Sequence, residues 1–250
     1  MSNLITDPAF YLVAIPAVLL MGISKSGFGA GFGALAVPLM ALAVPVPQAA
    51  AVMLPLLAIM DAMGLMALIR HADRPLLRLL VPAGLLGTVI GTVLFGLLSA
   101  KVVAGVVGAV TLAFLAIRLV FPPRADASPP PRWLGFLLGT TAGFTSFVAH
   151  AGGPPVGFYL LPQRLAPVVF TATTAVLFAV INASKWVPYA WLGLIDTRNL
   201  LTSLVLAPLA PVGVWIGLKV VRHINPVWFY RLFHLGMGLT GIKLLWDGLH

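Results

Sequence analysis

A glycine-rich segment of this chain combines a lysine with two hydroxyl groups. It reads GISKSGFGAGFG from residue 22 to residue 33. Glycine lets backbone N–H groups approach a ligand closely, and a lysine in apolar surroundings needs a partner. A small anion, held also by a helix N-terminus, would supply that partner. The residues predicted to bind it are Ser24, Lys25, Ser26, Gly29 and Gly31.

The alternative for this segment is close helix packing. Glycines at helical spacing let two backbones approach each other, and Lys25 would then extend its ammonium to a membrane interface. Both interpretations place the segment inside a membrane, and they differ in whether the lysine meets a ligand.

A second interruption repeats this composition without a lysine. It reads GFTSFVAHAGGPPVG from residue 143 to residue 157. Its hydroxyls suit the same anion, and its histidine could donate a hydrogen bond to that anion or carry a proton. A structural histidine with satisfied hydrogen bonds is the alternative, and the five histidines show no metal-ligand spacing. The residues predicted to bind the anion here are Thr145, Ser146, His150, Gly152 and Gly153.

Three further polar residues lie in long apolar stretches. Asp61 is acidic, and Asn182 has a similar place in a later stretch. A carboxylate inside a membrane is costly, so Asp61 is predicted to be a counter-ion or a proton carrier, with a structural pair to a lysine as the alternative. Lys185 follows Asn182 by one helical turn, where ligand contact and snorkelling to the interface are both open.

The composition indicates a membrane protein. Of the 250 residues, 60% are hydrophobic and 8% are charged, whereas a soluble domain carries about 25% charged residues. Apolar stretches fill nearly the whole chain, so the lipid bilayer is an expected partner and any site lies in or between helices. The net charge of +9 comes mostly from short loops and does not indicate nucleic acid. No set of nucleophile, base and acid is evident, so we predict neither an enzyme nor a cofactor or metal.

The chain is predicted to consist of two related halves. Three prolines at 129–131 forbid a helix and mark a break near the middle. A shift of 121 residues, with five extra residues in one later loop, aligns the halves. The coinciding pairs are Gly22 with Gly143, Ser24 with Thr145, Lys25 with Ser146, Gly31 with Gly152, Asp61 with Asn182, Pro82 with Pro208, Gly87 with Gly213 and Gly91 with Gly217. The predicted division is a first transmembrane repeat at 1–121, a cytoplasmic linker at 122–132 and a second repeat at 133–250.

Each half is predicted to hold two short apolar segments around its glycine-rich loop, followed by three long helices. About fifteen residues reach roughly 22 Å, less than the hydrocarbon core of about 30 Å. Such a pair would form a re-entrant or broken hairpin, unless both segments cross with tilt. The short segments are expected at 8–22, 34–45, 133–143 and 156–166, and the loops at 22–33 and 143–157. The long helices are expected at 48–70, 76–98, 101–121, 168–189, 199–220 and 227–247.

The distribution of positive charge predicts that the repeats are inverted. With an odd number of crossings in each half, ten Lys and Arg residues share one face of the membrane and three share the other. Positive loops are cytoplasmic, so both termini are predicted outside, with six to ten full crossings in total. The ten are Arg70, Arg74, Arg78, Arg118, Arg124, Arg132, Arg164, Lys219, Arg222 and Arg231, and the three are Lys101, Arg198 and Lys243.

The expected fold class is an all-α polytopic membrane protein with two inverted-topology repeats. Interrupted hydrophobic segments in matching places are a recurring plan of secondary transporters, with the site at the repeat interface. A stripe of small residues could pack within one chain or between two chains, which leaves a homodimer open. The stripe consists of Gly84, Gly87 and Gly91.

The two interruptions resemble the paired signatures of the TauE/SafE family of sulfite and organosulfur anion exporters. The resembling residues are GISKSGFGAGFGALAVPL from Gly22 and GFTSFVAHAGGPPVGFYLLPQR from Gly143. The resemblance covers nearly the full chain and implies a bacterial plasma-membrane protein that transports sulfite, a small sulfonate or a related anion. Thiosulfate-uptake relatives rely on pore cysteines, and this chain has none, which speaks against that branch.

We therefore expect a membrane transporter that exports a small anion, and the resemblance favours sulfite or a small organosulfonate. An inside-negative membrane potential would aid export of the anion. An anion channel or facilitator for a related oxyanion is the alternative, and it would show ohmic current without saturation. A membrane scaffold or membrane enzyme is a third class, in which substitution of Lys25 or Asp61 would leave anion binding unaffected.

Overall fold

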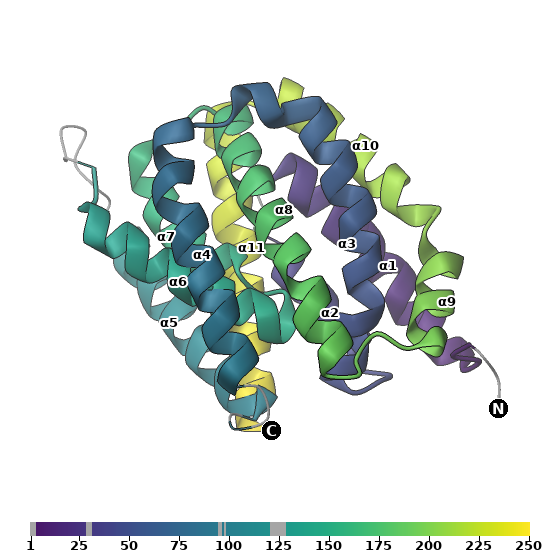
Figure 1. Cartoon of the computed structure of the whole chain (residues 1–250). Helices are drawn as coiled ribbons and strands as arrows, with labels where there is room; N and C mark the ends of the chain where they lie inside the picture. Colours follow the sequence, from purple (N-terminus) through teal and green to yellow (C-terminus); the bar gives the residue numbers. More distant parts are fainter. Residues whose placement is uncertain (1–3, 29–31, 95–96, 98, 121–128) are drawn as a thin grey trace.

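The computed structural model describes residues 4–28, 32–94, 97, 99–120 and 129–250. Within these residues all regular structure is helical, as the sequence predicts, and the helices form one bundle (Figure 1). The elements in chain order are α1 (Pro8–Gly27), η1 (Gly33–Leu35), α2 (Ala36–Met40), α3 (Val46–Leu68), η2 (Ile69–His71), α4 (Arg74–Leu94), α5 (Ala100–Val120), α6 (Arg132–Ala149), α7 (Gly153–Leu160), η3 (Leu161–Gln163), α8 (Pro167–Trp191), α9 (Thr197–Leu206), α10 (Leu209–His223) and α11 (Pro226–Leu249).

Several helices begin at a side chain that satisfies a free backbone N–H. Asp7 accepts a hydrogen bond from the N–H of Ala9 at 2.9 Å, and Pro8 is the first residue of α1. Asp196 accepts from the N–H of Asn199 at 2.7 Å and begins α9. First-turn N–H groups have no partner within their own helix, so such caps are favoured there, as is proline, which lacks the donor. Local sequence thus determines where these helices begin.

Five of the six predicted long helices are confirmed, as α3, α4, α5, α8 and α11. The prediction of one helix at 199–220 is wrong, because α9 and α10 meet there at a bend of 50°. Pro208 lies in this break and immediately precedes α10. Its ring and its missing N–H interrupt the hydrogen-bond ladder of a continuous helix.

The first interruption begins later than predicted. α1 continues past Gly22 to Gly27 instead of ending in a loop at residue 22. Gly22 is part of the helix, and its lack of a side chain allows α10 to pack closely. A methyl group added there would lie 2.9 Å from the Cα of Gly213. Because α1 continues to Gly27, its last turns hold three predicted site residues: Ser24, Lys25 and Ser26.

The second interruption is also shorter than predicted. α6 continues to Ala149 and ends at His150, which adopts a left-handed backbone with φ of 51°. The next helix, α7, begins at Gly153 rather than near residue 156, because Pro154 and Pro155 fall in its first turn. Proline is compatible with a first turn, where its missing N–H would be unpaired anyway.

Close helix pairings build the bundle. α1 packs along α10, α6 along α4, α5 along α11, and α3 against α8. A methyl group on Gly87 would lie 1.9 Å from the carbonyl oxygen of Thr140, and one on Gly143 would lie 2.0 Å from that of Gly84. The small-residue stripe of α4 therefore packs within this chain, chiefly against α6. A homodimer stays a prediction.

Apolar side chains cover much of the outer surface of the bundle. Met66, Val187 and Trp191, for example, are 79%, 78% and 81% exposed. Among the described residues, four helices are long and apolar enough to cross a membrane: α1, α3 with η2, α4 and α8. The bent pair of α9 and α10 makes a fifth if it counts as one span. The six to ten full crossings expected from the sequence stay a prediction.

Candidate functional site

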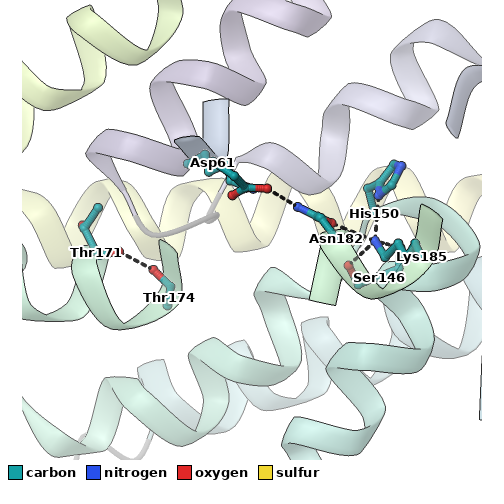
Figure 2. A network of polar contacts seen from close by, with 8 residues as sticks. Asp61, Ser146, His150, Thr171, Thr174, Asn182 and Lys185 are labelled. Carbon is teal, nitrogen blue, oxygen red and sulfur yellow. Dashed lines mark hydrogen bonds and ion pairs between the residues drawn. The ribbon is translucent and has the colours of Figure 1, made fainter. Parts of the chain in front are cut away.

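Six polar side chains meet in the middle of the bundle. α1, α3 and α6 supply one residue each, α8 supplies two, and the sixth, His150, directly follows α6 as its C-cap. Figure 2 shows contacts that run from Asp61 through Asn182 to Lys185, with Ser146 and His150 beside the lysine. All six are buried, and Lys185 is 0% exposed. This polar cluster consists of Lys25, Asp61, Ser146, His150, Asn182 and Lys185, all of which the sequence marked as site candidates.

Asp61 is held on both of its carboxylate oxygens. The Nζ of Lys25 lies 2.5 Å from Oδ1, and the Nδ2 of Asn182 donates a hydrogen bond to Oδ2 at 2.8 Å. A buried ion pair is stable only when its remaining lone pairs and protons also find partners. The amide of Asn182 supplies one of these partners, which explains why an asparagine faces the aspartate across the α3–α8 contact.

Lys185 is surrounded by hydrogen-bond acceptors. Its Nζ lies 2.6 Å from the carbonyl oxygen of Ser146, 2.8 Å from the hydroxyl of Ser146 and 3.0 Å from Oδ1 of Asn182. Nδ1 of His150 is a fourth neighbour, at 2.9 Å. Asn182 thus donates to the carboxylate and accepts from the ammonium, which assigns the orientation of its amide.

The contacts of His150 assign its tautomer. The ring is buried and none of its described contacts is with a carboxylate, so it is neutral, and Nδ1, which faces the Nζ of Lys185, accepts. Nε2 lies 3.1 Å from the carbonyl oxygen of Ala50, which can only accept, so Nε2 carries the proton. His150 therefore connects Lys185 to the backbone of α3.

Both lysines are associated with the C-terminal ends of broken helices. Lys25 belongs to the last turn of α1, and Lys185 reaches a carbonyl in the last turn of α6, that of Ser146. The C-terminal end of a helix carries partial negative charge and unpaired carbonyls, which favour a cation. The two interruptions therefore provide matching local environments for positive charge.

The polar cluster borders a small cavity. Its volume is about 20 Å³, enough for the centre of a single water molecule and too little for a sulfite ion or a sulfonate. The cavity must therefore widen before it can hold an anion. The lining residues are Met21, Lys25, Gly33, Leu57, Ser146, His150, Gly153, Phe178 and Asn182.

Of the other predicted binding residues that the structure describes, Gly153 lines this cavity and Ser24, Ser26, Thr145 and Gly152 do not. The hydroxyl of Ser24 accepts hydrogen bonds from the N–H groups of Phe32 and Gly33, at 2.9 and 2.8 Å, and thereby closes the first interruption. Ser26 is buried, and its hydroxyl has no hydrogen-bond partner among the described residues. Gly29 and Gly31 lie outside the described residues.

Thr145 closes the second interruption. Its hydroxyl lies 3.0 Å from the carbonyl oxygen of Thr141 and 3.1 Å from that of Ala151, so it acts as a donor. Gly152 provides space, because a methyl group there would lie 2.6 Å from the ring of Phe178. These two residues shape the turn, while Gly153 beside them does line the cavity.

Tyr189 belongs to the surroundings of the polar cluster and was missed in the sequence. Its hydroxyl donates to the carbonyl oxygen of Phe147 at 2.6 Å, and its ring lies 6.3 Å from that of His150. Asn182, Lys185 and Tyr189 follow the spacing i, i+3 and i+7 on one face of α8. That periodicity is the signal that could have identified it. Thr171 and Thr174, nearer the start of α8, bond within their own helix and lie apart from the cluster (Figure 2).

A larger cavity of about 260 Å³ lies beyond the polar cluster, between the ends of α5, α6 and α11 and the start of α3. Its charged residues are Lys101, Lys243 and Asp247, of which the last two form an ion pair. Ala149 lines it and is the chain neighbour of His150. In the described part of the chain, no group of three or more His, Asp or Glu residues could hold a metal ion.

The comparisons with known proteins agree with this picture of the chain. A profile of the family described as Sulfite exporter TauE/SafE matches residues 14–244. A search of curated proteins and a search of solved structures each found no match. Because the matched region spans both interruptions and every residue of the polar cluster, the chain belongs to the TauE/SafE family of sulfite exporters and is a multi-pass membrane protein.

Proposed function

We propose that this protein exports a small anion, sulfite or a small organosulfonate, and that the polar cluster is its binding site. The observation that carries the proposal is the pair of buried lysines, Lys25 and Lys185, beside a single carboxylate, Asp61. Charged groups in a membrane interior are costly, and they mark pathways for ions and substrates. A cluster with more cations than anions suits a negatively charged substrate.

Binding requires the anion to replace contacts that the protein makes with itself. Lys25 is paired with Asp61, and its release from that carboxylate would free an ammonium for the substrate. The hydroxyl of Ser146 and the amide of Asn182 border the same cavity and can replace part of the hydration shell of an oxyanion. Asp61 thus acts as a tethered anion that holds Lys25 until the substrate displaces it.

The cavity favours a carrier over an open channel. At about 20 Å³ it is too small to hold an anion as it stands, and its walls come from α1, α3, α6, α7, α8 and the short turn η1. Passage therefore needs helices to move apart, as alternating access requires. The membrane potential would drive export, because each elementary charge gains about 2.3 kcal/mol per 100 mV.

Inverted repeats, at 1–121 and 133–250, are part of the proposal. The pairing of α1 with α10 is matched by that of α6 with α4, as expected if each broken hairpin packs on the other half. The symmetric pairings of α3 with α8 and of α5 with α11 fit the same two-fold relation. Asp61 and Asn182 lie 121 residues apart and are hydrogen-bonded to each other. Equivalent residues of two repeats meet in this way when they lie beside the two-fold axis that relates the repeats.

We propose the bacterial inner membrane as the location, with both termini outside and the linker at 122–132 cytoplasmic. The connections α3–α4, α7–α8 and α10–α11, which carry much of the positive charge, lie at one end of the bundle (Figure 1). The start of α1 and the end of α11 lie at the opposite end (Figure 1). This arrangement supports the orientation that the positive-inside rule predicts.

Sulfite efflux from proteoliposomes tests the function. The purified protein should release trapped sulfite with saturating kinetics, and an excess of a small sulfonate should compete. Lys25→Met should abolish efflux, whereas Lys219→Met, on an exposed lysine that lies over the ring of Trp215, is the matched control and should retain it.

Two outcomes would contradict the proposal. Efflux no faster than from empty liposomes, under both a voltage and a pH gradient, would exclude sulfite and direct attention to other organosulfur anions. Ohmic current that does not saturate would replace the carrier with an anion channel.

A further inference from the structure

We infer that the polar cluster carries one excess positive charge and therefore selects a monovalent anion over a divalent one, with Asp61 setting that preference. The inference rests on the proposed function and specifies the charge class of the substrate. It depends on the protonation states of four residues, Lys25, Asp61, His150 and Lys185, and on the absence of a second acid beside Lys185 in the described part of the chain.

Lys185 is an ammonium in this arrangement. Its Nζ has four neighbours within 3.0 Å, and two of them, the carbonyl of Ser146 and Oδ1 of Asn182, can only accept hydrogen bonds. Nδ1 of His150 also accepts, because Nε2 holds the imidazole proton for the carbonyl of Ala50. Three obligatory acceptors match the three protons of an ammonium, whereas a neutral amine has only two.

Lys25 and Asp61 form an ion pair at 2.5 Å, so their charges cancel. His150 is neutral, because its ring is buried and none of the contacts described for it is with a carboxylate that could stabilise a second proton. The formal charge of the polar cluster is therefore +1, with Lys185 as the excess. Helix ends contribute only partial charges and do not change this formal count.

Among the residues that the structure describes, no second carboxylate is placed to balance Lys185. The chain has six acidic residues, and four of the other five are used at helix ends. Asp7 and Asp196 cap helices α1 and α9, Asp73 accepts from the N–H of Leu76 at the start of α4, and Asp247 pairs with Lys243. The fifth, Asp126, belongs to the polar linker and lies outside the described residues.

A monovalent anion would neutralise this site, while a divalent anion would leave one negative charge in a buried, poorly hydrated cavity. An uncompensated charge in such a place is strongly disfavoured. The preferred substrates are therefore hydrogensulfite and sulfonates without a second acidic group, and sulfate is disfavoured. Neutralising Asp61 would raise the excess charge to +2 and shift the preference to divalent anions.

Competition in the efflux assay tests the inference with two anions of fixed charge, methanesulfonate and sulfate. In the wild-type protein, methanesulfonate should inhibit sulfite efflux at a concentration at least tenfold lower than sulfate. In Asp61→Asn the ratio should fall at least tenfold or invert. Asp247→Asn removes a carboxylate outside the polar cluster and should keep the wild-type ratio.

A second variant and a binding measurement cover the case in which Asp61→Asn does not fold. Lys185→Met removes the excess charge while keeping Lys25 and Asp61 paired, so it should lose stabilisation by methanesulfonate in thermal unfolding. A wild-type protein that prefers sulfate, or an unchanged preference in Asp61→Asn together with retained stabilisation in Lys185→Met, would overturn the inference and leave the exporter intact. Absence of efflux for every anion in the wild type would instead reject the proposed function.

Discussion

The two interruptions build similar surroundings for a cation from different residues. The first carries its own lysine, Lys25, in the last turn of α1. The second has Ser146 in the last turn of α6, at the matching position of the sequence, and receives the ammonium of Lys185 from α8. A positive charge is thus present at both helix ends, although the residue that supplies it differs. Matching positions in two halves can therefore share an electrostatic role without sharing a residue type.

The hydroxyls that close the two interruptions differ in the same way. Ser24 accepts hydrogen bonds from two backbone N–H groups of the loop. Thr145, at the matching position, has only carbonyl oxygens as partners and donates. A hydroxyl can do either, because it holds one proton and two lone pairs. The two closing hydroxyls therefore have opposite hydrogen-bond roles at matching positions.

The largest expected difference separates the two lysines. Lys25→Met leaves the Asp61 carboxylate buried without its partner, which we expect to destabilise the fold by about 3–5 kcal/mol. Lys185→Met leaves only neutral groups behind, whose hydroxyl, amide and imidazole can turn to one another or to water, so we expect a smaller loss of about 1–3 kcal/mol in total. Thermal unfolding of the detergent-solubilised variants measures both. Recovery of the Lys25→Met loss in the double variant with Asp61→Asn would confirm the cause, and equal losses in the two single variants would contradict it.

Helix packing should also distinguish the halves. A methyl group on Gly143 would lie 2.0 Å from a carbonyl of α4, whereas one on Gly22 would lie 2.9 Å from α10. We expect Gly143→Ala to destabilise by about 1–3 kcal/mol and Gly22→Ala to cost less, since overpacking scales with the overlap to be relieved. Unfolding temperatures of the two variants, with Gly64→Ala as a control where the added methyl meets open space, check the order.

Removing the two closing hydroxyls gives a smaller contrast. Ser24→Ala deprives two N–H groups of their acceptor, so we expect a loss of about 1–3 kcal/mol. Thr145→Val keeps the side-chain shape and removes one shared donor, and we expect about 1 kcal/mol or less. Hydrogen exchange of the loop amides of Phe32 and Gly33 should accelerate in Ser24→Ala alone. Equal acceleration in both variants would argue against separate roles.

The smallest expected effect concerns His150, which has no counterpart in the first interruption. His150→Gly keeps the left-handed backbone, which glycine adopts readily, and removes one acceptor from Lys185. We expect the fold to persist and anion affinity to change by about 1 kcal/mol, roughly fivefold. Anion titrations followed by thermal shift would show it. An unchanged affinity would make His150 a purely structural residue.

Much of the architecture follows from local pattern in the sequence. Hydropathy located five of the six long helices, because apolar runs bounded by Asp, Asn and Pro have local physical causes for their ends. The pairing of Asp61 with Asn182 in sequence was also visible. The predicted ends of the interruptions are wrong. Glycine is typical of loops, and only the close approach of α10 shows why a helix has a glycine at position 22.

The roles within the candidate site were decided by tertiary structure. The sequence left Lys185 open between ligand contact and snorkelling, and it did not distinguish Ser24, which closes a turn, from Ser146, which faces the cavity. These differences arise from contacts between helices far apart in the chain, such as Lys185 with Ser146 and Lys25 with Asp61. Periodicity and composition indicate which residues share a helix face. They do not identify the partner of a buried charge, because only the packing of several helices brings donor and acceptor within about 3 Å.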